Sequence, residues 1–379
     1  MEKVKLLDVC EVYQPKTIAT KEFVSDGGYI VYGANGPIGR YTEYNHEESE
    51  ILMACRGATC GAINVSEPYS WINGNAMVVH PNGNVPLMKK YLMYFLMFAN
   101  KESIITGTAQ PQITRQNMRE FEIVICSEEK QKSIVARIEE LFSELDNGVE
   151  TLRKTKQQLA VYRQAVLKDA FESCDNKVEQ QFGETLVEKP RNGYSPKGVD
   201  FQTKYRNLTL SATTSGFFKG DCFKYIDIDI SDDSYLWVKR NDILIQRANT
   251  IEYVGTAVLY QGEDDQYVYP DLMMKCHAKE GIIPQFLVYQ LQSANCKKHF
   301  RNNATGTSGS MPKINQRTVM TAPIIMVPYD DQKRIVAEIE ARLSVCDSIE
   351  KTVDTALQQA EAMRQSILKK AFEGNHITK

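Results

Sequence analysis

Apolar and small residues recur at alternating intervals of four and three between residues 134 and 166. A stripe with this mean spacing of 3.5 residues predicts a long α-helix that packs against a partner helix, as in a coiled coil. The residues between the stripe positions are mostly Glu, Lys, Arg and Gln, which suits a solvated outer face. The stripe consists of Ile134, Ile138, Leu141, Leu145, Gly148, Leu152, Thr155, Leu159, Tyr162 and Val166.

The same stripe recurs 201 residues later, interrupted only by Arg342. We therefore predict a second long helix that pairs with the first in an antiparallel coiled coil; the alternative is that each helix only caps its own domain. Ser127 and Asp330 are the predicted N-caps. Gly148 is a candidate point of fraying or kinking, because a mid-helix glycine costs about 1 kcal/mol relative to alanine. The second stripe consists of Ile335, Ile339, Arg342, Cys346, Ile349, Val353, Ala356, Ala360, Met363 and Ile367.

The helices are the best-matched parts of an internal repeat. Residues 130–172 align with 331–373 without a gap, and identical runs include Ala170-Phe171-Glu172 and Ala371-Phe372-Glu373. Upstream the offset drifts from 201 to 192, as expected for two diverged copies with loops of different length. The sequence therefore predicts a pseudo-two-fold tandem duplication, with a variable globular part followed by a long helix in each copy.

The globular parts have the pattern of α+β domains, with short β-type runs separated by Gly- and Asn-rich turns. The predicted segments are 1–126 (first globular domain), 127–173 (first helical spacer), 174–328 (second globular domain) and 329–379 (second helical spacer). The expected strands are 29–32, 51–53, 76–79 and 122–125 in the first copy and 243–245, 257–259, 272–274 and 324–326 in the second. The expected shorter helices are 87–99 and 284–293.

The composition of the chain excludes some classes of protein. The chain has 45 Lys and Arg against 48 Asp and Glu, for a net charge of −3, which argues against a polybasic coat protein but leaves local basic patches open. Its longest apolar stretch, 91–99, is about half of what a membrane span needs, and no secretory signal opens the chain. Nine cysteines without framework spacing indicate reduced thiols, so we expect a cytoplasmic protein without a membrane partner.

Signatures of catalysis are missing. The sequence has no phosphate-binding Gly-x-x-x-x-Gly-Lys-Ser/Thr loop, no Gly-x-Gly-x-x-Gly fingerprint and no His-Glu-x-x-His helix. Cys55 and Cys60 have no second Cys/His pair at matching spacing, so no metal site is expected. A Cys55 or Cys60 nucleophile with His46 or His80 as base would need an oriented pair that sequence cannot show.

The loops carry side chains suited to nucleic acid. Arg matches guanine edges, Asn and Gln match adenine edges, and Ser, Thr and backbone amides suit phosphates. Each loop alone could be only a turn, but an Arg-containing loop follows the matched Ile-Leu strand in both copies, at Arg56 and Arg247. The residues predicted to face DNA are Arg56, Asn73, Asn75, Gln110 and Arg115 in the first copy and Arg191, Tyr194, Lys197, Arg247, Asn249, Ser308 and Lys313 in the second.

This layout resembles the specificity subunit of Type I restriction–modification systems over essentially the whole chain. The motifs that carry the resemblance are Thr106-Gly107-Thr108, Gln110-Pro111-Gln112-Ile113-Thr114 and Glu129-Lys130-Gln131, then Asn241 to Thr250, Thr305-Gly306-Thr307, Pro312-Lys313-Ile314-Asn315 and Asp331-Gln332. The first copy departs from the fuller Arg-Ala-Asn-Thr motif and has Ala54-Cys55-Arg56-Gly57 in its place.

The resemblance implies a non-catalytic subunit with two target-recognition domains. Each domain would read one half of a split double-stranded DNA target, while the helices set the spacing and dock two methyltransferase subunits and, through them, restriction subunits. S-adenosylmethionine, ATP and Mg would be bound by those partners and not by this chain. Two alternatives remain open: a structural adaptor that binds no DNA, and a specificity subunit of an orphan methylation system without restriction.

Overall fold

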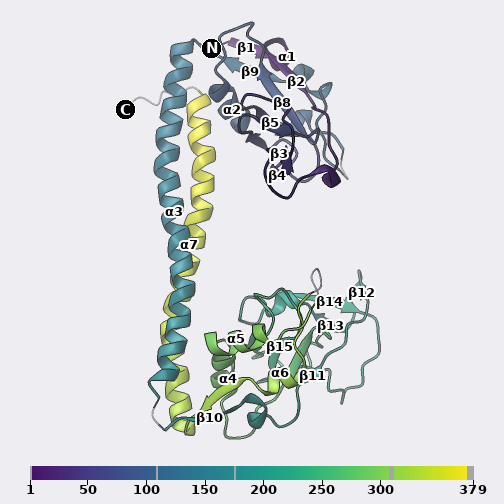
Figure 1. The fold of residues 1–379 in the computed structure, drawn as a ribbon, viewed down its shortest axis with the longest axis vertical. Helices are drawn as coiled ribbons and strands as arrows, with labels where there is room; N and C mark the ends of the chain where they lie inside the picture. The colour runs from purple at the N-terminus through teal and green to yellow at the C-terminus, as the bar shows by residue number, and fades with distance from the viewer. Residues whose placement is uncertain (1, 108–109, 175, 307–310, 374–379) are drawn as a thin grey trace. The chain divides into compact units, whose positions relative to one another are not determined.

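The computed structural model describes residues 2–107, 110–174, 176–306 and 311–373, and they form two compact units (Figure 1). Unit 1 contains residues 1–153 and 354–379, and unit 2 contains residues 154–353. Each unit therefore combines one globular part with portions of both long helices, whereas the predicted segments separated the globular parts from the helices. The reason is that the helices bury apolar side chains in the domain cores. No helix in the described ranges is both long enough and apolar enough to cross a membrane.

Unit 1 is built on a four-stranded antiparallel sheet with the strand order β2-β8-β5-β6. A three-stranded sheet, β4-β3-β7, and a strand pair, β1-β9, complete the unit. The elements are β1 (Glu2–Lys5), α1 (Leu6–Val9), β2 (Cys10–Tyr13), η1 (Thr20–Glu22), β3 (Tyr29–Gly33), β4 (Gly36–Tyr41), β5 (Ile51–Ala54), β6 (Ile63–Val65), β7 (Trp71–Ile72), β8 (Ala76–Pro81), α2 (Lys89–Phe98), η2 (Glu102–Ile104), η3 (Asn117–Glu120) and β9 (Glu122–Ile125).

Unit 2 repeats this plan, with a four-stranded sheet of order β11-β17-β15-β16 and the strand pair β10-β18. Its three-stranded sheet has the order β12-β14-β13. The elements are β10 (Val178–Gln181), η4 (Phe182–Thr185), β11 (Arg191–Asn192), β12 (Gly198–Val199), β13 (Tyr205–Leu208), η5 (Leu210–Ala212), β14 (Phe223–Ile226), β15 (Ile243–Gln246), β16 (Ala257–Leu259), β17 (Met273–Cys276), α4 (Pro284–Leu291), α5 (Ala294–Asn302), α6 (Gln316–Met320) and β18 (Pro323–Met326).

The matching orders of the two four-stranded sheets and of the two strand pairs confirm the α+β fold and the tandem duplication. Every predicted strand and short helix is present, although the strand expected at 272–274 begins one residue later and extends to Cys276. Runs of apolar residues such as Ile51–Ala54 form fully buried central strands, because side chains on both faces of these strands are covered.

The two long helices are α3 (Glu128–Glu172) and α7 (Tyr329–Phe372). They run antiparallel: within unit 2 Arg163 contacts Asp347 while Arg342 contacts Asp169, so the numbering rises along one helix and falls along the other. Each helix also enters a domain core. Phe372 packs against Tyr91 and Phe95 of α2 in unit 1, and the unit 2 core includes side chains from the end of α3 and the beginning of α7.

The helix seam is only partly the one that the stripe predicts. Ile138, Leu159, Ile335, Ile339, Val353 and Ile367 are buried, and Ile134, Leu141, Leu145 and Leu152 are half-buried. Ile349 and Met363 were wrongly placed in the seam, because their side chains are 40% and 53% exposed. In the column that begins at Ile134 and Ile335, the half-buried residue lies one position later than predicted at four places, which are Val149 and Arg163 in α3 and Glu350 and Arg364 in α7. Two arginines occupy this column, so a search for apolar residues alone misses it.

The helix starts and Gly148 also refine the prediction. Ser127 directly precedes α3, as expected, but α7 begins at Tyr329, so Asp330 lies inside the first turn and is not the N-cap. An acidic residue in the first turn still interacts favourably with the positive, N-terminal end of the helix dipole. α3 continues through Gly148 without interruption, so this glycine does not end or fray the helix.

Each long helix has a glutamine at the same position, and this glutamine is hydrogen-bonded to the start of a shorter helix. Gln131 is buried; its Oε1 accepts a hydrogen bond from the Met88 backbone N–H at 2.8 Å, and its Nε2 donates to the carbonyls of Pro86 and Cys126. Gln332 accepts from the Ile283 N–H at 2.9 Å and donates to the carbonyl of Val327. Met88 and Ile283 precede α2 and α4, whose first N–H groups lack partners within their own helix.

Candidate nucleic-acid interface

Three predicted residues of unit 1 gather where the central strand β5 ends. The Cys55 N–H donates to the Asn75 carbonyl, the Ile113 N–H donates to the Cys55 carbonyl at 3.0 Å, and Arg56 forms an isolated β-bridge with Gln112. These backbone contacts bring together the loops that carry Arg56, Asn75 and Gln110. All three residues are exposed, as is Arg115. The result is an exposed polar surface that carries arginine and amide side chains.

Unit 2 builds the same arrangement at the end of β15. The Ile314 N–H donates to the Arg247 carbonyl at 2.9 Å, the Arg247 N–H donates to the Leu272 carbonyl at 2.8 Å, and Ala248 forms a β-bridge with Lys313. Lys313 is exposed and Arg247 is half-buried. The arrangement therefore presents two cations from loops that are far apart in sequence.

Superimposing these contacts shows that Arg56 and Arg247 are not counterparts. Ile113 donates to Cys55 as Ile314 donates to Arg247, so Arg247 occupies the place of Cys55, and Arg56 occupies that of Ala248. The Cys55 side chain is buried, and its sulfur contacts the side-chain amide of Gln14 and the carbonyl of Asn75, both at 3.0 Å. The two units therefore present an arginine from neighbouring, non-equivalent positions of the loop.

Asn73 was wrongly predicted to face DNA. It is 3% exposed, and its Oδ1 accepts hydrogen bonds from the Ile18 N–H at 2.9 Å and the Trp71 indole at 3.1 Å. Its Nδ2 donates to the Ile18 carbonyl. A buried amide with these partners holds the segment after β2 in place.

The amide of Asn249 is also used internally, although the residue remains half-buried. Its Nδ2 donates to Gln246 Oε1 at 2.7 Å, and its Oδ1 accepts from the Thr250 N–H at 2.7 Å. Gln246 is fully buried and donates to Thr213 and Thr214. Asn249 therefore shapes the loop that carries Arg247.

The remaining predicted residues of unit 2 lie around β11. Tyr194 and Lys197 are exposed. Arg191 is half-exposed, pairs with Glu188 at 2.6 Å and stacks over the Tyr235 ring at 5.2 Å. Ser195 is linked to the Arg247 loop, because its hydroxyl bonds the Asp271 carboxylate at 2.5 Å and Arg247 donates to the Asp271 carbonyl at 3.4 Å. Ser308 lies outside the described residues.

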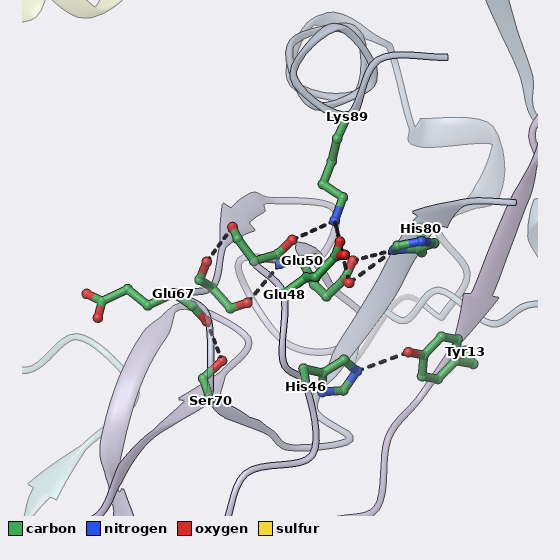
Figure 2. Close-up of polar contacts among 10 residues, drawn as sticks. Tyr13, His46, Glu48, Glu50, Glu67, Ser70, His80 and Lys89 are labelled. Carbon is green, nitrogen blue, oxygen red and sulfur yellow. Dashed lines mark hydrogen bonds and ion pairs between the residues drawn. The ribbon is translucent and has the colours of Figure 1, made fainter. Parts of the chain in front are cut away.

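A buried carboxylate occupies the opposite end of the central strand in both units. Glu50 directly precedes β5 and contacts His80 Nδ1 at 2.9 Å and Lys89 Nζ at 3.6 Å (Figure 2). Asp242 directly precedes β15 and contacts His277 Nδ1 at 3.1 Å and Lys275 Nζ at 3.4 Å. Since a buried charge is tolerated only with partners, these contacts fix the strand whose other end carries the arginine loop.

Neither histidine that sequence offered as a base for Cys55 or Cys60 is directed at a thiol. His46 contacts the Tyr13 hydroxyl at 3.0 Å, and His80 contacts Glu50 (Figure 2). Burial raises the pKa of the Cys60 thiol, which is opposite to what a thiolate nucleophile requires. Within the described part of the chain, no three His, Cys, Asp or Glu side chains gather as a metal site would require.

Part of the chain matches the model of a known protein family. Residues 1–159 match the model of the Type I restriction modification DNA specificity domain. The Type I restriction enzyme EcoKI specificity subunit of Escherichia coli (strain K12) is 24% identical over 258 residues, which are 65% of this chain and 55% of that protein. The StySPI specificity subunit of Salmonella potsdam is 24% identical over 347 residues, which are 84% of this chain and 68% of that protein. The chain thus spans little more than half the length of the EcoKI subunit.

One solved structure shares the fold over nearly the full length. It comes from work on complex assembly and conformational transition of the type I R-M system, and it aligns with 99% of this chain and 98% of its own chain. The TM-score is 0.69 and the sequence identity 14%. At this identity the likeness shows the fold alone: two repeated α+β parts, each followed by a long helix.

Proposed function

We propose, from the match of residues 1–159 to the Type I restriction modification DNA specificity domain, that the chain is the DNA-recognition subunit of a restriction–modification complex. Each unit would bind one half of a split double-stranded target. Two similar modules in one chain suit two half-sites separated by base pairs that are not read. The units differ in their loops, so the two half-sites would differ in sequence.

The observation that supports this proposal is the repeated loop arrangement at the ends of β5 and β15. In both units, backbone hydrogen bonds tie three loops together and leave Arg56 or Arg247 beside further polar side chains. Arginine with neighbouring amides and lysine provides donors for base edges and phosphates. The surface is built on a fully buried strand, so its geometry is held before DNA binds.

In this proposal the chain does no chemistry itself. Adenine methylation with S-adenosylmethionine would belong to two methyltransferase subunits docked on α3 and α7, and ATP and Mg would serve restriction subunits. The complex would work in the cytoplasm, where its DNA is. The net charge of −3 fits a subunit whose partners share the phosphate contacts.

The test is the methylome of matched cells with and without this chain. We expect a split adenine-methylated motif that disappears on deletion and returns when the gene is restored. Identical methylomes in both strains would leave two explanations, a silent recognition subunit and a structural adaptor. In that case, a pool of random DNA offered to the purified assembly separates a silent recognition subunit, which enriches a motif, from a structural adaptor, which enriches none.

A further inference from the structure

The strand registers identify counterparts for residues outside the matched motifs. Ile51 of β5 pairs with Val79 of β8 as Ile243 of β15 pairs with Cys276 of β17. One residue earlier on these partner strands, Val78 pairs with Tyr13. Lys275 pairs in the same way with Arg191. Tyr13 is therefore the counterpart of Arg191, and three residues further on Lys16 is the counterpart of Tyr194.

A side-chain contact confirms this alignment independently of the strands. The Gly74 backbone N–H donates to the Thr17 hydroxyl at 3.2 Å, and the Asp271 backbone N–H donates to the Ser195 hydroxyl at 3.0 Å. Thr17 directly follows Lys16, and Ser195 directly follows Tyr194. Both copies have a hydroxyl side chain at this position, Thr17 or Ser195. The residue before it differs in type between the copies, because it is Lys16 in one and Tyr194 in the other.

Several hydrogen bonds hold the segment around Lys16 against the turn between β7 and β8. Gln14 donates to the Gly74 carbonyl at 3.1 Å, Thr17 accepts from the Gly74 N–H, and buried Asn73 binds both the N–H and the carbonyl of Ile18. Gln14 also contacts Cys55, which directly precedes Arg56. The backbone on both sides of Lys16 is thus fixed beside the loops that carry Arg56 and Asn75.

The Lys16 side chain itself is exposed, and none of the described carboxylates forms an ion pair with it. An ammonium group on a fixed backbone, next to an arginine and an exposed amide, is a suitable partner for a phosphate oxygen. Lysine acts as a strongly hydrated point charge and lacks the planar fork that arginine offers to a guanine. Its chemistry therefore favours the DNA backbone over a base edge.

We infer that Lys16 contacts a phosphate beside the half-site bound by unit 1, in the place that Tyr194 occupies in unit 2. This inference rests on the proposed function. It adds a residue that no sequence motif singles out, and it gives Asn73 and Thr17 the role of positioning residues.

The experiment measures DNA binding by the full chain co-assembled with its methyltransferase partner. The wild-type assembly first selects its motif from a random double-stranded pool, and the selected duplex is then titrated by fluorescence anisotropy at several salt concentrations. The variants are Lys16→Met, Lys16→Arg and, as a matched charge control, Lys3→Met, whose side chain is 73% exposed on β1. Thermal unfolding of each variant reports on the fold.

We expect Lys16→Met to weaken binding about three- to tenfold at moderate salt and to reduce the slope of log K against log salt by about 0.9, the value for one lost phosphate contact. The selected motif and the unfolding temperature should stay unchanged. Lys16→Arg should restore the wild-type slope, and Lys3→Met should match the wild type.

A wild-type slope for Lys16→Met would overturn the inference, and so would an equal loss for Lys3→Met, which would indicate only net charge. If Lys16→Met changes the selected motif, Lys16 contacts a base and not a phosphate, and the inference is overturned. If Lys16→Met lowers the unfolding temperature, Lys16→Arg decides: a wild-type slope supports the contact, and a reduced slope overturns it. A wild-type assembly that selects no motif contradicts the proposed function itself, which is a distinguishable result.

Discussion

Arg163 of α3 donates to the Asp347 carboxylate of α7 at 2.5 Å, and the same ion pair recurs between Arg364 and Asp146. Both members of the second pair lie 201 residues from their counterparts in the first. Arg163 also contacts Glu350 at 2.9 Å. Because an ion pair at a helix seam forms in one register only, the two pairs specify how the antiparallel helices align.

The Arg163 pair should contribute modestly to stability. Arg163→Ala should lower the free energy of unfolding by about 1 kcal/mol, because the arginine is half-buried but its partner Asp347 is largely exposed. Urea denaturation followed by helical circular dichroism measures the loss. Lys168→Ala is the control, since Lys168 and Glu172 form an exposed pair at 3.8 Å; an equal loss there would contradict a special role for the seam pair.

Gln131 and Gln332 should matter more than surface glutamines. Replacing either by Met keeps the approximate volume but leaves a backbone N–H and at least one carbonyl without a partner, at a cost of about 1–3 kcal/mol. Urea denaturation of both variants should show this loss. Gln157→Met on the exposed face of α3 should change stability by less than about 0.5 kcal/mol. Similar values for all three would mean that the buried bonds are replaced by water.

Substitutions at two glycines should have opposite signs. A Cβ at Gly148 would meet no atom within 4 Å, so Gly148→Ala should stabilise α3 by about 1 kcal/mol. A Cβ at Gly193 would lie 2.0 Å from the Tyr269 carbonyl oxygen, so Gly193→Ala should displace the loop that carries Tyr194 and destabilise unit 2. Thermal unfolding tests both. A loss of stability in Gly148→Ala would indicate that α3 must bend there.

Lys101 should make stability depend on pH. Burial lowers the pKa of its ammonium group to about 8, whereas in the unfolded chain the pKa is roughly 10.4. Below pH 8 both states are protonated, and the cost of burying the charge is fully present. Between these two values the unfolded chain binds more protons, so the free energy of unfolding rises with pH.

The corresponding variant is Lys101→Met, which should stabilise the protein by about 1–2 kcal/mol at pH 7. The gain should shrink as pH approaches about 10. Denaturation curves across this range measure both effects, and Lys3→Met provides the exposed control. A gain that is independent of pH would show that the effect comes from packing and not from the buried charge.

Arg56→Ala and Arg247→Ala should affect different half-sites. Each removes a candidate base-reading guanidinium from one unit only, and loss of such a contact costs about 1–3 kcal/mol. Motif selection by the assembled complex should show relaxed preference in one half with Arg56→Ala and in the other half with Arg247→Ala. Equal relaxation of both halves by either variant would contradict the assignment of one half-site to each unit.

The repeat and the pattern of apolar residues were enough to predict the architecture. Continuous apolar runs such as Ile51–Ala54 became buried central strands, and the 3.5-residue stripe became α3 and α7. The exact seam was not predictable in this way, because Arg163 and Arg364 lie in the seam as ion pairs with acidic residues of the other helix. Such positions depend on a partner that is distant in sequence and not on the hydrophobicity of the residue itself.

The candidate site was predicted less well than the fold. Its residue type favoured Asn73 as a DNA contact, but its amide is buried and bonded to the backbone of Ile18. Arg56 and Arg247 both follow a matched strand and therefore seemed equivalent in sequence, but the backbone contacts place them one position apart in the loop. Lys16 had no motif to identify it, since its position depends on strand register and on Thr17. Exposure and equivalence are properties of the folded loops, which diverged most between the copies.

The recurrence of the Arg163–Asp347 pair has a consequence for how such a chain can arise and be engineered. Each half of the polypeptide encodes both a donor and an acceptor, Arg163 with Asp146 in the first and Arg364 with Asp347 in the second. A half-length product therefore carries a self-complementary helix that can close on a second copy of itself. If each unit binds one half-site, as proposed, such a homodimer would have two identical recognition domains and would favour a palindrome. Fusion of two halves would then allow the two half-sites of the target to differ.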